Sequence, residues 1–429
     1  MKTPAPKFVC HGCGTIVDIA QRLPFACPHA GGSDDVDHLL VPDDGGEFAP
    51  GSESNPFLRY RALLSPYRLA RGAGLSEDAW AEFNGLLDEA LAEIEGRGFR
   101  LTPMAREPVL ARAAGLGEGL WVKDETINVA GSHKARHLMG VMLYLRVLAA
   151  ARLPAGQGLS RRRLAIASCG NAALAAAVVA RAADWPIDVF IPPDAPESVV
   201  RRLKELGAAI EICRRFGDES GDPCVRAFRR AVRKGAIPFG VQGPDNGLAI
   251  EGGRTLAFEM ADAWRAAGVV PVAVYVQVGG GALASAIAQG LSIAVAQGLL
   301  PRRPHLITVQ TAGCAPLARA WRKLSGVALP EAAVHRTRFM WPWEETPVSI
   351  AHGILDDETY DWWEVAKGMR ETEGDAVVVD EDTLAHAYSL AHAHTEIDVS
   401  VTGAAGLAGL LAVRPETGNV AVIFSGVER

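Results

Sequence analysis

The stretch LWVKDETINVAGSHKARH, residues 120–137, gives the first indication of the fold. Residues 120–122 have the aromatic and β-branched character of a buried strand, and residues 134–150 have the apolar spacing of a helix. A polar turn that ends in Gly131-Ser132-His133-Lys134 joins the two. A strand that passes through a short turn into a long helix is the repeating unit of α/β proteins.

The same unit recurs along the rest of the chain. Further strands are predicted at residues 164–167, 188–191, 209–212, 272–278, 306–309, 376–379 and 420–424. Further helices are predicted at residues 77–96, 172–183, 197–206, 248–267 and 383–394. Nearly continuous apolar strands of this kind belong to parallel sheets that helices cover on both faces. We therefore predict an α/β fold with two doubly wound parallel-sheet lobes and a ligand cleft between them.

Composition and charge restrict the partners of the chain. Of its 429 residues 49% are apolar, which at ~100–200 residues per domain corresponds to two or three globular domains. The formal charge of −7 makes nucleic acid and anionic membranes unfavourable partners. Two apolar stretches, residues 164–180 and 283–300, are interrupted by polar residues and are too short to span a bilayer. We therefore expect neither a nucleic-acid nor a membrane partner.

The chain also lacks the signs of a secreted protein. Residues 1–7 are polar and contain proline, with no apolar run behind them, which does not resemble a signal peptide. The seven cysteines are an odd number and imply no disulfide framework. We expect a cytoplasmic location.

Three polar or glycine-rich turns follow predicted strands, where parallel sheets bind their ligands. They are Gly131–Lys134, Ser168-Cys169-Gly170-Asn171 and Gly279-Gly280-Gly281-Ala282. Glycines let the backbone close on an anion, and the helix N-terminus behind them supplies N–H donors. The third turn is not GxGxxG and no P-loop motif occurs near it, so nucleotide binding is poorly supported. Each turn alone is also compatible with ordinary helix capping.

Lys134 is unusual because the chain prefers arginine for its basic residues. Only eight of the 43 basic residues are lysines. Unlike a guanidinium, a partly buried amine can lose its proton and act as a nucleophile. An exposed lysine at a helix start is the alternative interpretation.

Together these segments resemble the fold-type II pyridoxal-phosphate enzymes, which include threonine synthase, threonine and serine dehydratases and the tryptophan synthase β chain. Lys123-Asp124-Glu125 with Gly131–Arg136 resembles the cofactor-lysine segment, Ser168–Asn171 the S-x-G-N loop, and Gly279–Leu283 the phosphate-binding GGG-x-L loop. Ser425, after the strand at residues 420–424, resembles the serine that faces the pyridine nitrogen. The resemblance extends from about Asn55 to the C-terminus.

The resemblance implies a cofactor, pyridoxal 5′-phosphate, in the cleft between the lobes, and a role for each matched residue. Lys134 would form the Schiff base and carry the Cα proton, and Asn171 would bind the ring oxygen. The backbone N–H groups of Gly279, Gly280, Gly281 and Ala282 would bind the phosphate. Ser132, Ser168, Cys169 and Gly170 would bind the substrate carboxylate. Ser425 would leave the ring nitrogen unprotonated, which suits elimination or replacement better than transamination. A homodimer is implied as well.

The N-terminal 50 residues form a separate region in this interpretation, with a cysteine ribbon and an acidic linker ahead of a catalytic region at 51–429. Cys10-x-x-Cys13 resembles half of the zinc ribbon with which many threonine synthases begin, but the second pair reads Cys27-Pro28-His29-Ala30. A structural zinc site needs four N or S ligands, so His29 or His11 would have to complete it. Within the catalytic region we expect a smaller lobe at about residues 135–245, inserted in the larger lobe.

The motifs combine features of several subfamilies, so the substrate stays open. Threonine synthases usually read N-P-T-G-S-F-K-D, whereas this chain has Val129, Ala130, His133 and Ala135 at the varied positions. The phosphate loop is more similar to that of dehydratases, but their acidic E-P-x-G-A residue is replaced by Ser400. His133 and His137, which flank the lysine, either pack in the core or take part in acid–base chemistry.

The resemblance therefore implies a pyridoxal-phosphate lyase or synthase that acts on a small amino acid. The reaction would remove the Cα proton and then eliminate or replace a β or γ substituent, as in the ammonia-lyases (dehydratases). The first alternative is threonine synthase acting on O-phosphohomoserine. The second is a cofactor-binding protein without catalytic activity.

Overall fold

The computed structural model describes residues 6–215, 222–415 and 417–429. Residues near the N-terminus form a small antiparallel sheet in the order β2-β1-β3, with β1 (Lys7–Cys10), β2 (Ile16–Asp18) and β3 (Leu40–Pro42). Strand β3 lies inside residues 31–51, which we expected to form an acidic, glycine-rich linker, and that expectation is wrong for residues 40–42. Leu40 and Val41 are buried there because β3 pairs with β1, with Cys10 opposite Leu40.

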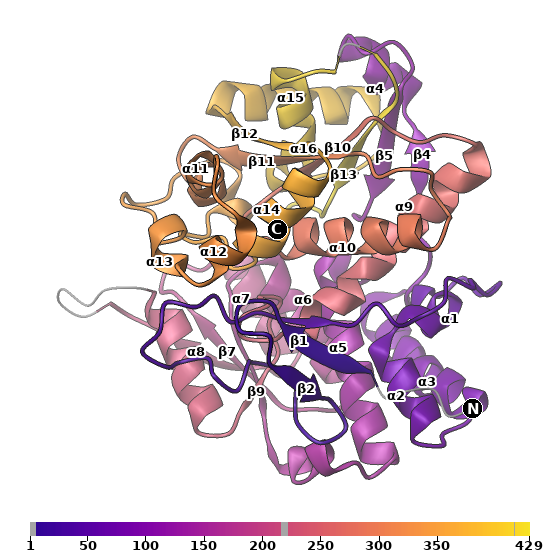
Figure 1. The fold of residues 1–429 in the computed structure, drawn as a ribbon, viewed down its shortest axis with the longest axis vertical. Helices are drawn as coiled ribbons and strands as arrows, with labels where there is room; N and C mark the ends of the chain where they lie inside the picture. Colours follow the sequence, from indigo (N-terminus) through magenta and orange to yellow (C-terminus); the bar gives the residue numbers. More distant parts are fainter. Residues whose placement is uncertain (1–5, 216–221, 416) are drawn as a thin grey trace.

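The larger of the other two sheets occupies the upper part of Figure 1. It has six strands in the order β12-β11-β10-β13-β5-β4. The strands are β4 (Met104–Arg106), β5 (Leu120–Asp124), β10 (Ala273–Gln277), β11 (His305–Thr311), β12 (Asp375–Val379) and β13 (Val420–Phe424). All pairings are parallel except that of the short edge strand β4 with β5.

The smaller sheet lies in the lower part of Figure 1 and is entirely parallel. Its order is β8-β7-β6-β9, with β6 (Leu164–Ala167), β7 (Ile187–Ile191), β8 (Ala209–Ile212) and β9 (Ile237–Pro238). These strands come from one continuous interval of the chain, and the strands of the larger sheet come from both sides of it. The two parallel sheets confirm the predicted α/β fold class.

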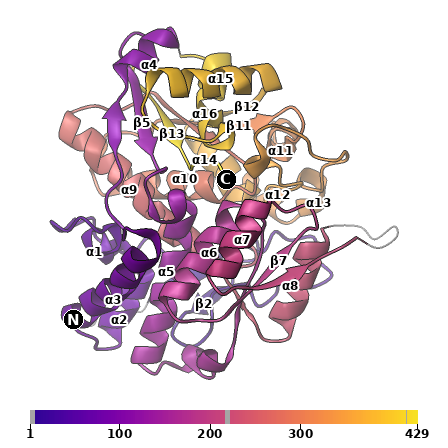
Figure 2. The ribbon, with the colours of Figure 1, turned by 180° about the vertical axis from the view of Figure 1, so that it is seen from behind.

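Helices cover both sheets, and Figure 2 shows their arrangement from behind. The helices of the two lobes include α5 (Lys134–Ala150), α6 (Asn171–Ala182), α9 (Ala249–Ala267), α10 (Ala282–Ala296), α14 (Trp362–Glu371) and α16 (Val401–Ala412). The other α-helices are α1 (Pro56–Arg59), α2 (Ser65–Gly72), α3 (Glu77–Glu95), α4 (Pro108–Ala113), α7 (Glu197–Glu205), α8 (Pro223–Arg233), α11 (Pro316–Lys323), α12 (Leu329–Ala333), α13 (Arg336–Phe339) and α15 (Glu381–His394). Short 3-10 turns are η1 (Arg61–Leu63), η2 (Val129–Gly131), η3 (Pro154–Gly156), η4 (Leu159–Arg161) and η5 (His352–Ile354).

Helix α5 is buried along most of its length. It packs closely on α9, because a Cβ atom at Gly140 would lie only 2.9 Å from the Cα of Gly252. The N-terminal sheet belongs to the same core: Phe8 and Ile19 are fully buried in it, and Tyr144 of α5 donates a hydrogen bond to Ile19 O at 2.8 Å. The cysteine region is therefore packed on the smaller lobe.

A network of four buried charges joins β5, α5 and α9. Glu259 binds Lys123 Nζ and Arg136 Nη1, both at 2.5 Å. Arg136 also donates to both oxygens of Glu125, at 2.8 and 2.9 Å. Burial alone would raise the pKa of Glu259, but Arg136 and Lys123 outweigh it and hold that pKa below its ordinary value. The Glu259 carboxylate is therefore easier to ionise than an isolated buried carboxylate.

Within the described residues, no single helix is both long and apolar enough to cross a membrane. One pair, Lys134–Ala150 with Pro154–Arg161, meets the length and composition criteria only when it is counted together, and it is bent by 105° at its break.

Replacing Arg136 with Met should strongly destabilise the fold. The substitution leaves the two buried carboxylates, Glu125 and Glu259, to share one cation, Lys123, so one buried negative charge is uncompensated, which costs ~3–5 kcal/mol of unfolding free energy. Urea or thermal unfolding measures the change. The matched control is Glu118→Ala, which breaks an exposed ion pair with Arg112 and should cost less than ~1 kcal/mol. Equal effects of the two substitutions would contradict a structural role of the network.

Candidate active site

The ends of several strands bring the predicted site residues together. Lys134 is the first residue of α5, Asn171 the first of α6 and Ala282 the first of α10, and each helix follows the turn at the carboxyl end of a parallel strand. Ser425 follows β13, which pairs with both β5 and β10. This arrangement is the one in which parallel sheets bind ligands.

Lys134 lies at the end of a strained turn. Ala130 has φ 53° and Gly131 φ 59°, in the left-handed region that disfavours residues with a Cβ. The lysine side chain remains partly accessible. Burial among neighbouring protein atoms lowers the pKa of the Lys134 ammonium, and the Asp356 carboxylate partly offsets this effect. The amine is therefore easier to deprotonate than that of a surface lysine.

The Ser425 hydroxyl is positioned by a buried amide. Gln277 Nε2 donates a hydrogen bond to Ser425 Oγ at 2.6 Å, which uses one acceptor position and leaves the hydroxyl proton free to donate. The backbone of Ser425 is held against the lysine turn, because His133 N donates to Ser425 O at 3.1 Å. Ser425 thus lies beside the turn that carries Lys134, as a partner of a ring nitrogen would require.

Ser132 and Asn171 present polar groups near this turn. The Ser132 hydroxyl is buried and has no hydrogen-bond partner among the described residues, an unusual state that a ligand would relieve. Arg429 Nε donates to Asn171 Oδ1 at 2.6 Å, and its Nη2 donates to Ala130 O. Because the amide oxygen is already used, Asn171 Nδ2 is left to donate to a ligand oxygen. The sequence analysis missed Arg429.

The glycine turn before α10 is shaped by close backbone approaches. Gly281 has φ 98°, and a Cβ at Gly279 would lie 2.9 Å from the Cα of Ile354. Side chains at these positions would require neighbouring backbone to move. The turn leads into the N-terminus of a fifteen-residue helix, where N–H groups favour an anion. These residues fit a phosphate group.

A carboxylate lies at this turn that the sequence analysis did not identify. Asp356 accepts a hydrogen bond from the Gly280 N–H, and its Oδ2 would lie 2.4 Å from a Cβ at Gly279. Burial raises the pKa of Asp356, with Asp357 adding to the effect and Lys134 opposing it. The acidic run that starts at Asp356 was the only signal in the sequence, and such runs are usually solvated.

The two histidines that flank Lys134 have structural partners. His133 Nδ1 lies 3.2 Å from Ser425 O, and His137 Nδ1 lies 3.0 Å from Ala249 O. Both rings are buried. Burial lowers the pKa of His137 to about 3, and the Lys134 charge adds to this shift. Burial also lowers the pKa of His133 well below its ordinary value, so both sites favour the neutral imidazole, which agrees with the packing interpretation.

Ser168, Cys169 and Gly170 lie between β6 and α6, in the position predicted for them, and all three remain partly accessible. The Gly170 N–H donates only a long hydrogen bond, 3.4 Å, to Ser168 Oγ. Weakly used N–H groups at the start of a twelve-residue helix suit a carboxylate ligand.

The cysteine cluster has a different fourth member from the one expected. Cys10, Cys13, Cys27 and His38 place one ligand atom each within 4.8 Å of all the others. His29 does not belong to this set: its Nδ1 lies 3.8 Å from Cys13 Sγ and 3.2 Å from Thr15 Oγ1. His11 instead pairs with Glu364. The three cysteines therefore group with His38 and not with His29 or His11, which we expected, because pairing of β3 with β1 brings residue 38 back to Cys10.

Comparisons with known proteins agree with this geometry. The sequence model of the family described as "Pyridoxal-phosphate dependent enzyme" matches residues 97–426. A serine dehydratase-like protein of Rattus norvegicus is 31% identical over 195 residues, 45% of this chain and 52% of that protein. Threonine synthase of Mycobacterium leprae is 25% identical over 312 residues, 72% of this chain and 75% of that protein. The chain thus spans about half the length of the serine dehydratase-like relative.

Solved structures share the fold. Diaminopropionate ammonia lyase from Escherichia coli superposes with a TM-score of 0.58 at 18% identity, over 88% of this chain and 92% of that one. Maize serine racemase gives a TM-score of 0.57 at 22% identity, over 80% and 92%. At these identities the likeness concerns the fold alone.

Asp356→Asn should increase the affinity for pyridoxal phosphate. The carboxylate occupies an N–H group of the phosphate turn and repels an anion, so its removal should tighten binding by tenfold or more, about 1.4 kcal/mol. In the wild type, affinity should fall as pH rises through the raised pKa of Asp356, and the variant should lose this dependence. Titration of the protein with the cofactor, followed by absorbance, measures both effects.

Asp357→Asn is the matched control, since it removes the neighbouring charge and leaves the hydrogen bond of Asp356 to Gly280 in place. We expect a smaller change in affinity than for Asp356→Asn. Equal affinities of the wild type and Asp356→Asn across the pH range would show that the phosphate does not bind at this turn.

Proposed function

Because the chain belongs to the family of pyridoxal-phosphate dependent enzymes, we propose that it is a lyase that removes the β substituent of a small amino acid and releases ammonia. The observation that carries the proposal is that Ser425, whose proton is free to donate, lies beside the turn that carries Lys134. A hydroxyl at the ring nitrogen does not protonate it, and this suits elimination rather than transamination. The serine dehydratase-like relatives and the ammonia-lyase fold neighbours support the same reaction class.

The residues described above fit the cofactor. Lys134 would hold its aldehyde carbon, Asn171 its ring oxygen, Ser425 its ring nitrogen, and Gly279–Ala282 its phosphate. When bound, pyridoxal phosphate supplies an aldehyde that joins amines and a conjugated ring that makes the Cα proton of the joined amino acid acidic.

The chain's own residues would then orient the substrate and move its protons. Ser132 and the Ser168–Gly170 turn bind the carboxylate, which holds the Cα–H bond toward the lysine. The Lys134 amine, with its depressed pKa, accepts the Cα proton. Loss of the β substituent with a proton gives water from a hydroxy amino acid or ammonia from a diamino acid. The released enamine tautomerises and is hydrolysed to a 2-oxo acid and ammonia.

The charge of the site favours a neutral or cationic β substituent. Asp356 lies at the phosphate turn, and burial raises its pKa above the ordinary value, with repulsion from Asp357 adding to the shift. Its protonated form can donate to a departing hydroxyl group, and its ionised form can bind an ammonium group. A second phosphate near these acids would be repelled. Serine, threonine and 2,3-diaminopropionate are therefore better candidates than O-phosphohomoserine.

Threonine synthase is the second candidate function. The relative from Mycobacterium leprae supports it, because that match spans 75% of the relative and not just half. A threonine synthase would need cations for the phosphate of its substrate, whereas Asp356 lies at the cofactor turn and Asp357 follows it in the chain.

A substrate screen tests the proposed reaction. Incubation with serine, threonine, 2,3-diaminopropionate or O-phosphohomoserine should give 2-oxo acid and ammonia from at least one of the first three. Lys134→Ala should lose at least ~10²–10⁴-fold of this activity, because it removes the group that moves the Cα proton. Lys204→Ala, on the exposed side of α7, is the matched control and should retain it. Threonine and phosphate from O-phosphohomoserine would favour the second candidate, and inertness toward all four would overturn both.

We also propose that Cys10, Cys13, Cys27 and His38 hold a structural zinc ion. Zn–S bonds of ~2.3 Å and Zn–N bonds of ~2.0–2.1 Å imply ligand separations of ~3.8 Å for S···S and ~3.6 Å for S···N in a tetrahedron. The Cys13 and Cys27 sulfurs lie 3.7 Å apart, and Cys10 Sγ lies 3.6 Å from His38 Nδ1. His38 Nε2 also lies 3.4 Å from Asp34, a carboxylate contact of the kind that orients zinc-bound histidines.

Elemental analysis distinguishes the two histidines. The wild type should contain about one zinc per chain, and His38→Ala should lower this content together with the unfolding temperature. His29→Ala, the matched control, should change neither. Zinc loss in His29→Ala but not in His38→Ala would contradict the proposed ligand set, as would a metal-free wild type.

The homodimer and the cytoplasmic location stay predictions. The proposed reaction depends on neither of them.

A further inference from the structure

A small cavity lies between the N-terminal sheet and helices α9, α10 and α14 of the larger lobe. Its volume is about 220 Å³. None of the residues that line it belongs to the cofactor turn. One wall comes from β1, β3 and the residues next to them, and the opposite walls come from α9, α10 and α14. The residues of the first wall are Val9, His11, Val41, Pro42, Asp43 and Asp44. The N-terminal wall precedes the segment that matches the family, so the cavity exists because this chain carries the additional N-terminal sheet.

The walls combine buried groups of both charges. Glu364 of α14 and Arg254 of α9 have only 3% and 2% of their side-chain surface exposed. His11 pairs with Glu364, and Arg254 donates to Gln289 Oε1 at 2.9 and 2.6 Å. Arg254 Nη1 makes only a long contact, 3.6 Å, with Asp44. Buried charges are costly unless partners surround them.

One cation at the cavity forms no ion pair with the described residues. Lys367 of α14 lies 5.9 Å from the centre of the Trp363 ring, and no ion pair to its ammonium is found in the part of the chain that the structure describes. Asp44, on the opposite wall, is 68% exposed and holds Arg254 only loosely. The cavity thus offers a cation and a carboxylate that can each take a further partner.

We propose that this cavity binds a free α-amino acid as a regulatory ligand. The carboxylate of the ligand would pair with Lys367 and Arg254, and its ammonium group with Asp44 and Glu364. A volume of about 220 Å³ is below the range of ~300–1,000 Å³ for drug-sized ligands and suits a molecule of this size. Two further carboxylates of the lining, Asp43 and Glu371, already pair with Arg68 and Arg303 outside the cavity. A zwitterion supplies a partner of each sign to the remaining groups without adding net charge.

Two helices connect the cavity to the cofactor turn. Helix α10 begins at Ala282 of that turn and carries Gln289 and Ser292 to the cavity. Helix α14 begins just after Asp361, whose N–H donates to Gly280 O at 2.9 Å. A ligand that pulls Lys367 or Glu364 toward α9 would therefore shift the segments that hold the cofactor phosphate. This coupling rests on the function proposed above, whereas binding itself does not.

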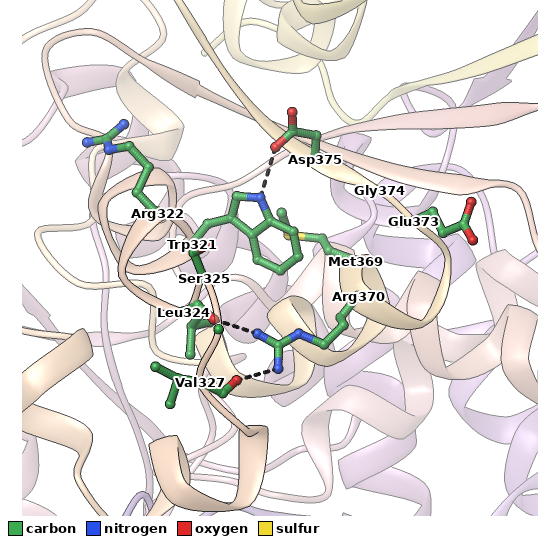
Figure 3. A pocket seen from close by; sticks show the side chains of 11 residues that line it. Trp321, Arg322, Leu324, Ser325, Val327, Met369, Arg370, Glu373, Gly374 and Asp375 are labelled. Atoms are coloured by element: carbon green, nitrogen blue, oxygen red, sulfur yellow. Dashed lines mark hydrogen bonds between the residues drawn. The ribbon is translucent and has the colours of Figure 1, made fainter.

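The larger surface pocket, of about 690 Å³, is a weaker candidate because its half-buried polar side chains, Trp321 and Arg370, already have hydrogen-bond partners (Figure 3). Trp321 Nε1 donates to Asp375 at 2.9 Å, and Arg370 donates to the carbonyls of Val327 and Leu324 at 2.7 and 2.8 Å. A ligand there would have to displace these hydrogen bonds.

Equilibrium dialysis of the full chain with radiolabelled glycine, L-alanine, L-threonine or L-isoleucine tests the proposal. Borohydride treatment of the cofactor-loaded enzyme first joins cofactor and protein permanently, so that amino acids no longer react in the active site. We expect one equivalent of at least one amino acid per chain to bind. Glu364→Gln and Lys367→Met should each weaken this binding about tenfold or more, since each removes one of the paired charges.

Kinetics and a control variant complete the test. Lys367→Met should keep the basal activity, because Lys367 contacts no residue of the active site described above, but it should lose any change in kcat/KM that the bound amino acid causes in the wild type. Lys204→Met should behave as the wild type in both assays. Binding that is absent at ~10 mM ligand, or that both cavity variants retain, would overturn the proposal. Binding without any change in kcat/KM would overturn its regulatory part. Dialysis measures binding and not turnover, so it tests the cavity even if the protein is inactive in the substrate screen.

Discussion

The buried network of Lys123, Glu125, Arg136 and Glu259 is the interaction on which the site depends. Its members come from β5, the segment after it, α5 and α9, so it fixes a strand of the large sheet against two central helices. Asn128 Nδ2 extends it to the lysine turn, with hydrogen bonds to Glu125 at 2.9 Å and to Ser132 O at 3.2 Å. Since opposite charges balance within it, the network tolerates burial that would neutralise an isolated charge. Lys134 is the first residue of α5, two residues before Arg136, so the network also fixes the position of the Lys134 backbone.

The same network accounts for the strained backbone at Ala130. A left-handed residue persists only where its surroundings determine it more strongly than its own preference. Here Asn128 and the pairing of Ser132 with Gly426 hold the turn from both sides. This turn carries Lys134 and lies beside Ser425.

Much of this arrangement could be predicted because it depends on local pattern. The bounds of α5, β6, β8 and β13 agree with the predicted residues, since apolar periodicity and turn residues mark them. Ser425 follows β13 directly, Lys134, Asn171 and Gly279–Ala282 lie in the turns or helix starts that follow β5, β6 and β10, and parallel topology brings strand ends together. Such residues are visible in a sequence without knowledge of long-range contacts.

Other parts depend on contacts between distant segments and could not be predicted in this way. His38 replaces His29 because β3 pairs with β1, and the short run Leu39–Val41 was the only sign of that strand. Asp356 and Arg429 reach the site from segments without regular structure. The amphiphilic cavity at Lys367 arises only when the N-terminal sheet packs on three helices. The position of Lys134 remains the central claim, and mapping the lysine that borohydride links to pyridoxal phosphate tests it most directly. Peptide mass spectrometry should find the cofactor on Lys134 alone, whereas labelling of Lys123 or of several surface lysines would contradict the account.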